Sequence, residues 1–202
     1  MPFARGFKTR CENLAETVRK DLALQAVAAL APELLASYLS VRLIEPKDIP
    51  GLSQQALDVL LRSDNADWSA LTLGEDGSNT LIIFNPAHSA GRRASDLSHE
   101  MAHLLLRHVP STLMFSPDGT WTLRSFDGDQ EEEANWLAGC LLLPRVALLS
   151  TLKSGLSEEQ VAERYGVSTQ MVRYRGDVTG VKRQYAAGAR LRATPRRTAA
   201  RQ

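Results

Sequence analysis

The sequence contains one short motif with the spacing of a metal site: His99, Glu100 and His103 form the pattern HExxH. Residues four apart share one face of a helix, so both histidines can direct ring nitrogens at one metal ion. Glu100 follows the first histidine and is placed to take a proton from a metal-bound water. The alternative is a pair of core-edge histidines, but burying two imidazoles beside an apolar helix face requires a partner that satisfies them. The motif therefore predicts a zinc site with Glu100 as general base.

An acidic run supplies the candidates for a third ligand, since a catalytic zinc site usually has three protein ligands and a water. A helix is predicted from about residue 130 to 143, and Glu131 lies on its buried stripe. Glu132 and Glu133 begin the flanking faces, where solvent is the default. Helix phase favours Glu131 as the ligand and Asn135, one turn later, as the residue that orients a ligand. Manganese also suits two histidines and a carboxylate.

Two further histidines have no clear place in this pattern. His108 comes five residues after His103, roughly 140° around a continued helix, so it is predicted to point elsewhere as a surface or capping residue. His88 follows Pro86 and is a candidate for polarising a substrate carbonyl or stabilising the oxyanion.

The elements that must position these residues follow from hydrophobic periodicity. Helices are predicted over residues 7–22, 32–39, a short segment after Ser53, 92–107 and 130–143. Strands are predicted over 41–44, 68–73 and 80–84, with turn residues at 74–79 that favour a hairpin. Residues 113–126 are interpreted as another hairpin or a mobile loop. The expected class is α+β, with a small antiparallel sheet beside the HExxH helix.

The segment after Gly155 has the pattern of a helix-turn-helix. Ser157 and Gln160 form a capping box for one helix, and Ser168 caps the next. Arg173 and Arg175 on that second helix could meet phosphates. The interpretations are DNA binding, docking of a protein substrate, and packing against the preceding domain. The predicted organisation is a peptidase domain over 1–155, a helix-turn-helix-like subdomain over 156–185, and a disordered basic tail over 186–202.

Composition places the chain among ordinary globular proteins, with 44% hydrophobic and 23% charged residues. The N-terminus has no apolar core of signal-peptide length, and no stretch approaches the roughly 18 apolar residues of a membrane span, so a cytoplasmic protein without membrane contact is expected. Cys11 and Cys140 are expected to be buried and unpaired. The net charge of residues 156–202 is +6, against −5 for the rest, which is compatible with an acidic partner or a solubilising tail.

Three stretches resemble the ImmA/IrrE-type metallopeptidases of bacteria and their mobile elements. They are SHEMAHLLL at 98–106, EEEANWLAGCLLLP at 131–144, and VAERYGVS at 161–168 followed by MVRYR at 171–175. The second matches the family signature E-x-x-A-N-x-x-A-x-x-L-L-x-P. The resemblance implies a zincin-like core, zinc ligands at His99, His103 and Glu131, and a catalytic Glu100. Ala102 and Leu137 depart from the usual Gly and Phe, which leaves subfamily and substrate open.

The resemblance also implies a regulatory role. Members typically cleave a helix-turn-helix repressor of the XRE type, commonly encoded beside the protease, and so release the promoters it holds. The expected function is therefore a zinc-dependent endopeptidase with a repressor as substrate. The alternative is a metal-binding transcriptional regulator, or a protein that sequesters the repressor with little or no peptidase activity.

Overall fold

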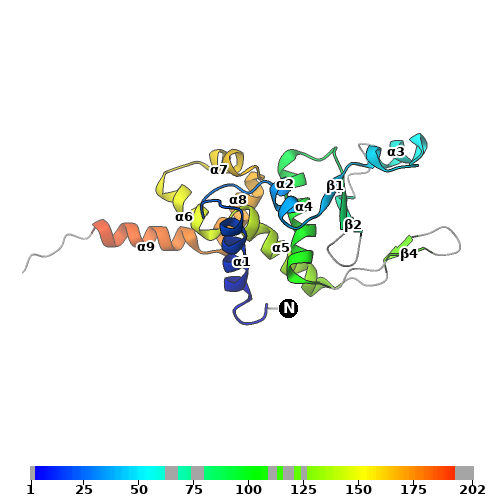
Figure 1. Cartoon of the computed structure of the whole chain (residues 1–202). Helices are drawn as coiled ribbons and strands as arrows, with labels where there is room; N and C mark the ends of the chain where they lie inside the picture. The colour runs from blue at the N-terminus through cyan, green and yellow to red at the C-terminus, as the bar shows by residue number, and fades with distance from the viewer. Residues whose placement is uncertain are drawn as a thin grey trace, which may run out of the picture.

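A computed structural model of the chain describes residues 3–61, 68–73, 80–108, 113–115, 121–123 and 127–193 (Figure 1). In chain order the elements are α1 (Phe7–Asp21), α2 (Pro32–Tyr38), β1 (Arg42–Ile44), η1 (Pro46–Asp48), α3 (Gln54–Leu61), β2 (Ala70–Leu73), β3 (Leu81–Phe84), α4 (Ala90–Leu106), β4 (Leu113–Phe115), β5 (Trp121–Leu123), α5 (Gly128–Leu142), α6 (Arg145–Lys153), α7 (Glu158–Tyr165), α8 (Thr169–Val178) and α9 (Val181–Ala193). Helices and a small three-stranded sheet are combined in one fold, which confirms the α+β class.

The three-stranded sheet has the order β1-β3-β2 and is mixed. The predicted hairpin is confirmed, because β2 pairs antiparallel with β3 and Thr72 lies opposite Ile82. The prediction of an antiparallel sheet is wrong for β1, which runs parallel to β3 with Leu43 opposite Ile82. The connection through η1 and α3 lets β1 occupy the far edge, which strand propensity alone does not specify. The turn predicted at 74–79 lies outside the described residues.

The second predicted hairpin, over 113–126, is confirmed for its strands, since β4 and β5 pair antiparallel with Phe115 opposite Trp121. The loops around these strands lie outside the described residues.

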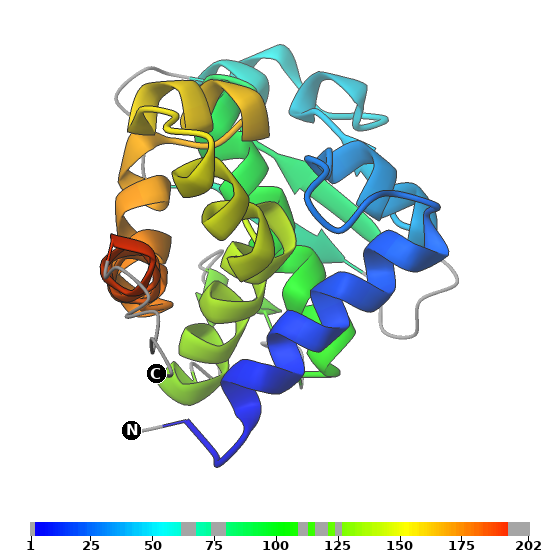
Figure 2. The same ribbon diagram turned by 90° about the vertical axis from the view of Figure 1, so that its left-hand side faces the viewer.

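Two helices, α4 and α5, pack against each other at the centre of the molecule, and α1 lies against α5 (Figure 2). Ser89 caps α4 by accepting a hydrogen bond from the Arg92 N–H, and Arg107 ends it in the left-handed conformation. Asp127 caps α5, which ends before Pro144 because the residue preceding a proline disfavours helix. Among the described residues no single helix is long and apolar enough to cross a membrane, although α5 and α6 together, bent by 45°, meet the length and composition test.

The main core lies between α1, α4, α5 and the sheet. Its fully buried members include Phe7, Cys11, Val18, Ile82, Met101, Leu137, Cys140 and Leu141. Both cysteines are buried and free, as expected. Burial raises the pKa of the Cys11 thiol to about 12, so this thiol stays protonated and unreactive near pH 7.

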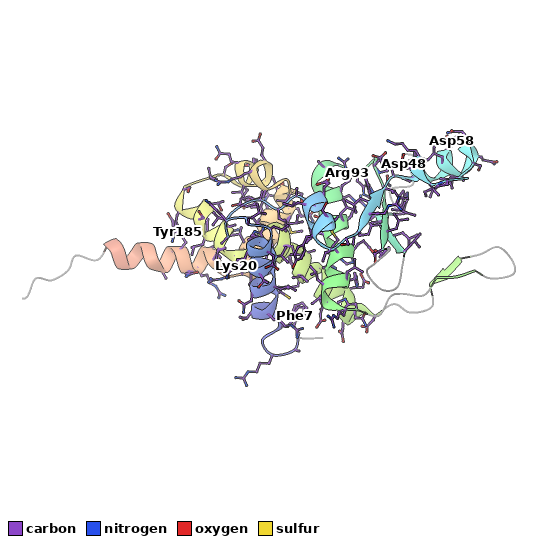
Figure 3. All side chains as sticks on the ribbon, viewed as in Figure 1. Phe7, Lys20, Asp48, Asp58, Arg93 and Tyr185 are labelled. Carbon is purple, nitrogen blue, oxygen red and sulfur yellow. The ribbon has the colours of Figure 1, made fainter. Side chains whose placement is uncertain are left out.

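The C-terminal helices form a second apolar cluster. The capping box of Ser157 and Gln160 begins α7, and Gly166 turns the chain with φ of 63° toward α8. Val161, Tyr165 and Val172 pack in this cluster. The predicted disordered tail is wrong for its first residues, because α9 continues to Ala193; residues 194–202 lie outside the described part. In Figure 3, Tyr185 of α9 and Asp58 of α3 lie at opposite ends of the molecule.

Arg175 of α8 does not face solvent, so the prediction that it meets phosphates is wrong. Its side chain is 0% exposed, its Nη2 donates to Oε1 of Glu12 at 2.6 Å, and its Nε donates to the Leu143 carbonyl at 3.1 Å. Glu12 Oε2 also accepts the Arg145 N–H at the start of α6. This pair joins α1, the end of α5, α6 and α8, while the exposed Arg173 is paired with a glutamate of α7.

Candidate metal centre

The two histidines of the motif and the predicted acid come together between α4 and α5. His99 Nε2 lies 3.1 Å from His103 Nε2 and 3.1 Å from Glu131 Oε2, and His103 Nε2 lies 3.4 Å from Glu131 Oε1. Ligand atoms bound to a tetrahedral zinc at about 2.0–2.1 Å are about 3.3 Å apart. The donor set and its spacing therefore fit one divalent ion. Among the described residues these three form the group of histidine, cysteine and acidic side chains that could hold a metal.

The side chains of the three residues are partly exposed, at 21% for His99, 23% for His103 and 31% for Glu131. Neutral imidazoles can share a hydrogen bond between these two nitrogens, and when both rings carry their proton on Nδ1 the two Nε2 lone pairs and the Glu131 carboxylate converge on a position that suits one cation. Burial and the neighbouring His99 lower the pKa of His103 to about 4, so the ring is neutral near pH 7. The neutral ring is the form that binds metals.

Asn135 lies where the helix phase predicted, one turn after Glu131. Its Oδ1 is 3.0 Å from His99 Nδ1 and can only accept a hydrogen bond there. This contact places the His99 proton on Nδ1 and leaves Nε2 with a lone pair that can bind a metal ion. An outer hydrogen bond of this kind orients the ring of a metal-binding histidine.

The general-base candidate, Glu100, is held by the sheet. The Thr72 hydroxyl of β2 donates a hydrogen bond to Glu100 Oε2. Burial raises the pKa of the Glu100 carboxyl, and the Thr72 hydrogen bond and the nearby His99 offset part of that rise. Thr72 faces the site while Leu71 and Leu73 on the same strand are exposed, at 37% and 41%. In most strands the apolar side chains face the interior and the polar ones face solvent, and here the order is reversed. The strand pattern therefore could not predict that Thr72 faces the site.

His108 does not point away from His103, and that prediction is wrong. Its Nδ1 lies 2.9 Å from His103 Nδ1, and its Nε2 lies 3.2 Å from Glu133 Oε2. The projection of 140° assumed a continued helix, whereas α4 ends at Leu106 and Arg107 is left-handed with φ of 56°. That turn brings the His108 ring back over the last turn of α4. Glu133, assigned to a solvent-facing flank, contacts this ring instead.

Within the described part of the chain, no hydrogen bond or ion pair joins His88 to His99, His103 or Glu131. Its Nδ1 is 2.8 Å from Asp96 Oδ2, and its Nε2 is buried with no hydrogen-bond partner there. Arg93, labelled in Figure 3, donates from Nη1 to the His88 carbonyl at 2.7 Å. These contacts fix the entry to α4, and a role of His88 at the oxyanion stays a prediction.

The chain is similar to known proteins in a family pattern and in fold. The family model of the IrrE N-terminal-like domain, in peptidase family M78, matches residues 54–176, which is more than half of the chain. The match includes both histidines, Glu100, Glu131 and the whole of α7. No curated protein matches the chain in sequence.

One solved structure shows the same fold. A Mycobacterium tuberculosis transcriptional regulator is similar with a TM-score of 0.53 at 15% identity, over 83% of this chain. The chain spans 46% of the length of that regulator.

Proposed function

The chain belongs to the peptidase family of IrrE N-terminal-like domains, and from this premise we propose that it is a zinc-dependent endopeptidase that cleaves a helix-turn-helix repressor. Family membership supports a metallopeptidase connected with regulation. The identity of the substrate, a repressor, goes beyond what family membership supports and is part of the proposal. The observation behind the proposal is the convergence of His99, His103 and Glu131 beside Glu100, at distances that fit one ion.

In this proposal His99 and His103 bind the ion through Nε2 and Glu131 binds it through its carboxylate. Zinc held by these three residues would lower the pKa of a bound water and polarise the carbonyl of the scissile peptide bond. Manganese is the alternative for the same ligand set.

Glu100 moves the proton. The Thr72 hydrogen bond to Oε2 restrains the rotation of the carboxylate and leaves Oε1 available to accept the proton of the attacking water. Burial moves the pKa of this carboxyl upward, in the direction of neutral pH, and a group works best as general base and acid when its pKa is near the working pH. Glu100 then gives the proton to the departing amine.

The substrate assignment depends on the family resemblance. A repressor encoded beside the gene is the expected partner. The transcriptional regulator with the same fold is in keeping with a regulatory setting, although its similarity concerns the fold alone.

The test compares wild type with Glu100→Gln, both loaded with zinc, in mixtures with the helix-turn-helix protein encoded next to the gene. Intact mass is followed over time. Wild type is expected to produce one new cut, and the variant is expected to cleave about 10²–10⁴ times more slowly, since one general base contributes about that factor. The variant should still bind one equivalent of zinc. If neither protein cuts while both hold zinc, the peptidase proposal is rejected in favour of sensing or sequestration.

A further inference from the structure

We propose that His108 and Glu133 are positioning residues that hold the His103 ring in the tautomer and orientation that bind the metal. This inference rests on the proposed function, since it concerns the same metal site. It adds two residues that neither the HExxH pattern nor the acidic signature assigns a role.

The first argument is the direction of the hydrogen bonds. A metal on His103 Nε2 requires the ring proton on Nδ1, which lies 2.9 Å from His108 Nδ1. His108 Nδ1 must then accept, so its own proton sits on Nε2, 3.2 Å from Glu133 Oε2. A carboxylate accepts that hydrogen bond. Once the metal is bound, the two hydrogen bonds therefore run in one direction: His103 donates to His108, and His108 donates to Glu133.

The second argument is burial. The His108 side chain is only 7% exposed, and Glu133 is 27% exposed. A buried imidazole needs partners for both nitrogens, and the two partners here are a predicted ligand and an acid. A histidine that only filled space would not need a carboxylate from another helix turned toward it.

The third argument is the backbone. Arg107 adopts φ of 56°, a left-handed conformation that glycine usually provides at a helix end, and it does so with a Cβ. The His108 N–H donates to the His103 carbonyl at 3.0 Å. This turn, together with the hydrogen bond, places the His108 ring against the His103 ring, with the two Nδ1 atoms 2.9 Å apart.

The two metal-binding histidines are thus supported differently. His99 is held by the neutral amide of Asn135, whereas His103 is held by a buried ring that ends on a carboxylate. Glu131 and Glu133 both come from the first turns of α5, so one helix supplies a ligand and the anchor of another ligand. A carboxylate at the end of such a chain also makes the ligating nitrogen more basic.

The experiment measures the zinc affinity of the metal-free protein by competition with a chromophoric chelator, using zinc ions alone as the probe. His108→Phe and Glu133→Leu are each expected to weaken zinc binding about 10- to 100-fold, the usual cost of losing an outer-shell partner. His108→Gln keeps an acceptor and a donor on one side chain and is expected to restore most of the affinity. Glu132→Leu removes the neighbouring, exposed carboxylate and is the matched control, with affinity unchanged.

Thermal unfolding of the metal-free variants separates positioning from folding. The proposal expects melting temperatures close to wild type and a loss that appears in zinc affinity. Full affinity in His108→Phe and Glu133→Leu would overturn it, and so would a His108→Gln variant as weak as His108→Phe. If His108→Phe does not fold, the comparison of zinc affinity between Glu133→Leu and its control Glu132→Leu tests the proposal. Wild type without zinc binding would instead refute the metal site itself, and the inference with it.

Discussion

The side chains between α4 and α5 and those between α1 and α8 are both clusters of ionisable groups, but they differ in exposure and in pairing. At the first cluster, His99, His103 and Glu131 are 21–31% exposed and their donor atoms converge on one another. At the second, Arg175 is 0% exposed, and Glu12 and a main-chain carbonyl face it.

The difference shows how surroundings decide what a charged side chain does. Two imidazole nitrogens and a carboxylate converge within 3.1–3.4 Å of one another, a set of ligand atoms that suits a divalent cation. The Arg175–Glu12 pair is balanced in charge and connects four elements, so removing one of its two members costs stability. The first cluster suits the metal binding proposed for it, and the second joins elements of the fold.

Metal removal should produce the largest effect and act on the first cluster alone. Chelation is expected to bring cleavage of the repressor to background, with recovery on adding zinc. The helical circular dichroism should persist, because the cores around Leu137 and Val161 contain none of the ligands. Loss of the helical signal on chelation would contradict the independence of the two regions.

Arg175→Leu should produce the next effect, on stability. Removing one member of a buried ion pair leaves Glu12 unpaired, which costs about 3–5 kcal/mol in the free energy of unfolding. Urea denaturation measures it. Arg173→Leu is the matched control on the same helix, because the Arg173 side chain is exposed and its ion pair with Glu158 is solvated. Its midpoint of urea denaturation should equal that of wild type.

The double change of Arg175→Leu with Glu12→Leu sharpens this result. It should recover part of the loss, since no charge is then left buried without a partner. An Arg175→Leu protein as stable as wild type would show that the ion pair has no structural role, and phosphate contact would need to be considered again.

Gly139→Ala should produce the smallest effect. A Cβ at this position of α5 would lie 2.8 Å from Cδ of Arg175, whose guanidinium is already fixed at its far end. Overpacking costs about 1–3 kcal/mol, and the higher helix propensity of alanine offsets up to about 1 kcal/mol. A net loss of about 1 kcal/mol in chemical denaturation is expected. In the Arg175→Leu background the same change should become neutral or stabilising; equal effects in both backgrounds would refute the contact.

Much of the fold could be predicted from local pattern. Capping residues and apolar periodicity placed α1, α4, α5 and α7 within a few residues of their observed bounds, and Ser168 marked the start of α8. The helix α6 had no prediction, because its cap is the side chain of Glu12 from another helix. The parallel pairing of β1 was missed because a strand sequence does not specify its neighbour. The roles assigned to the site residues stay predictions, with geometry that supports them.

Features that depend on spacing along one helix could be predicted from the sequence alone. His99 and His103 share a face because they are four apart, and Glu131 and Asn135 share one for the same reason. Which of these helix faces pack against each other, and which other side chains reach the site, depends on tertiary contacts. Thr72 reaches Glu100 from a sheet, His108 returns to His103 through a left-handed Arg107, and Arg175 turns inward to Glu12. Each of these depends on contacts between segments distant in the chain or on a break in helical geometry, and helical periodicity contains neither.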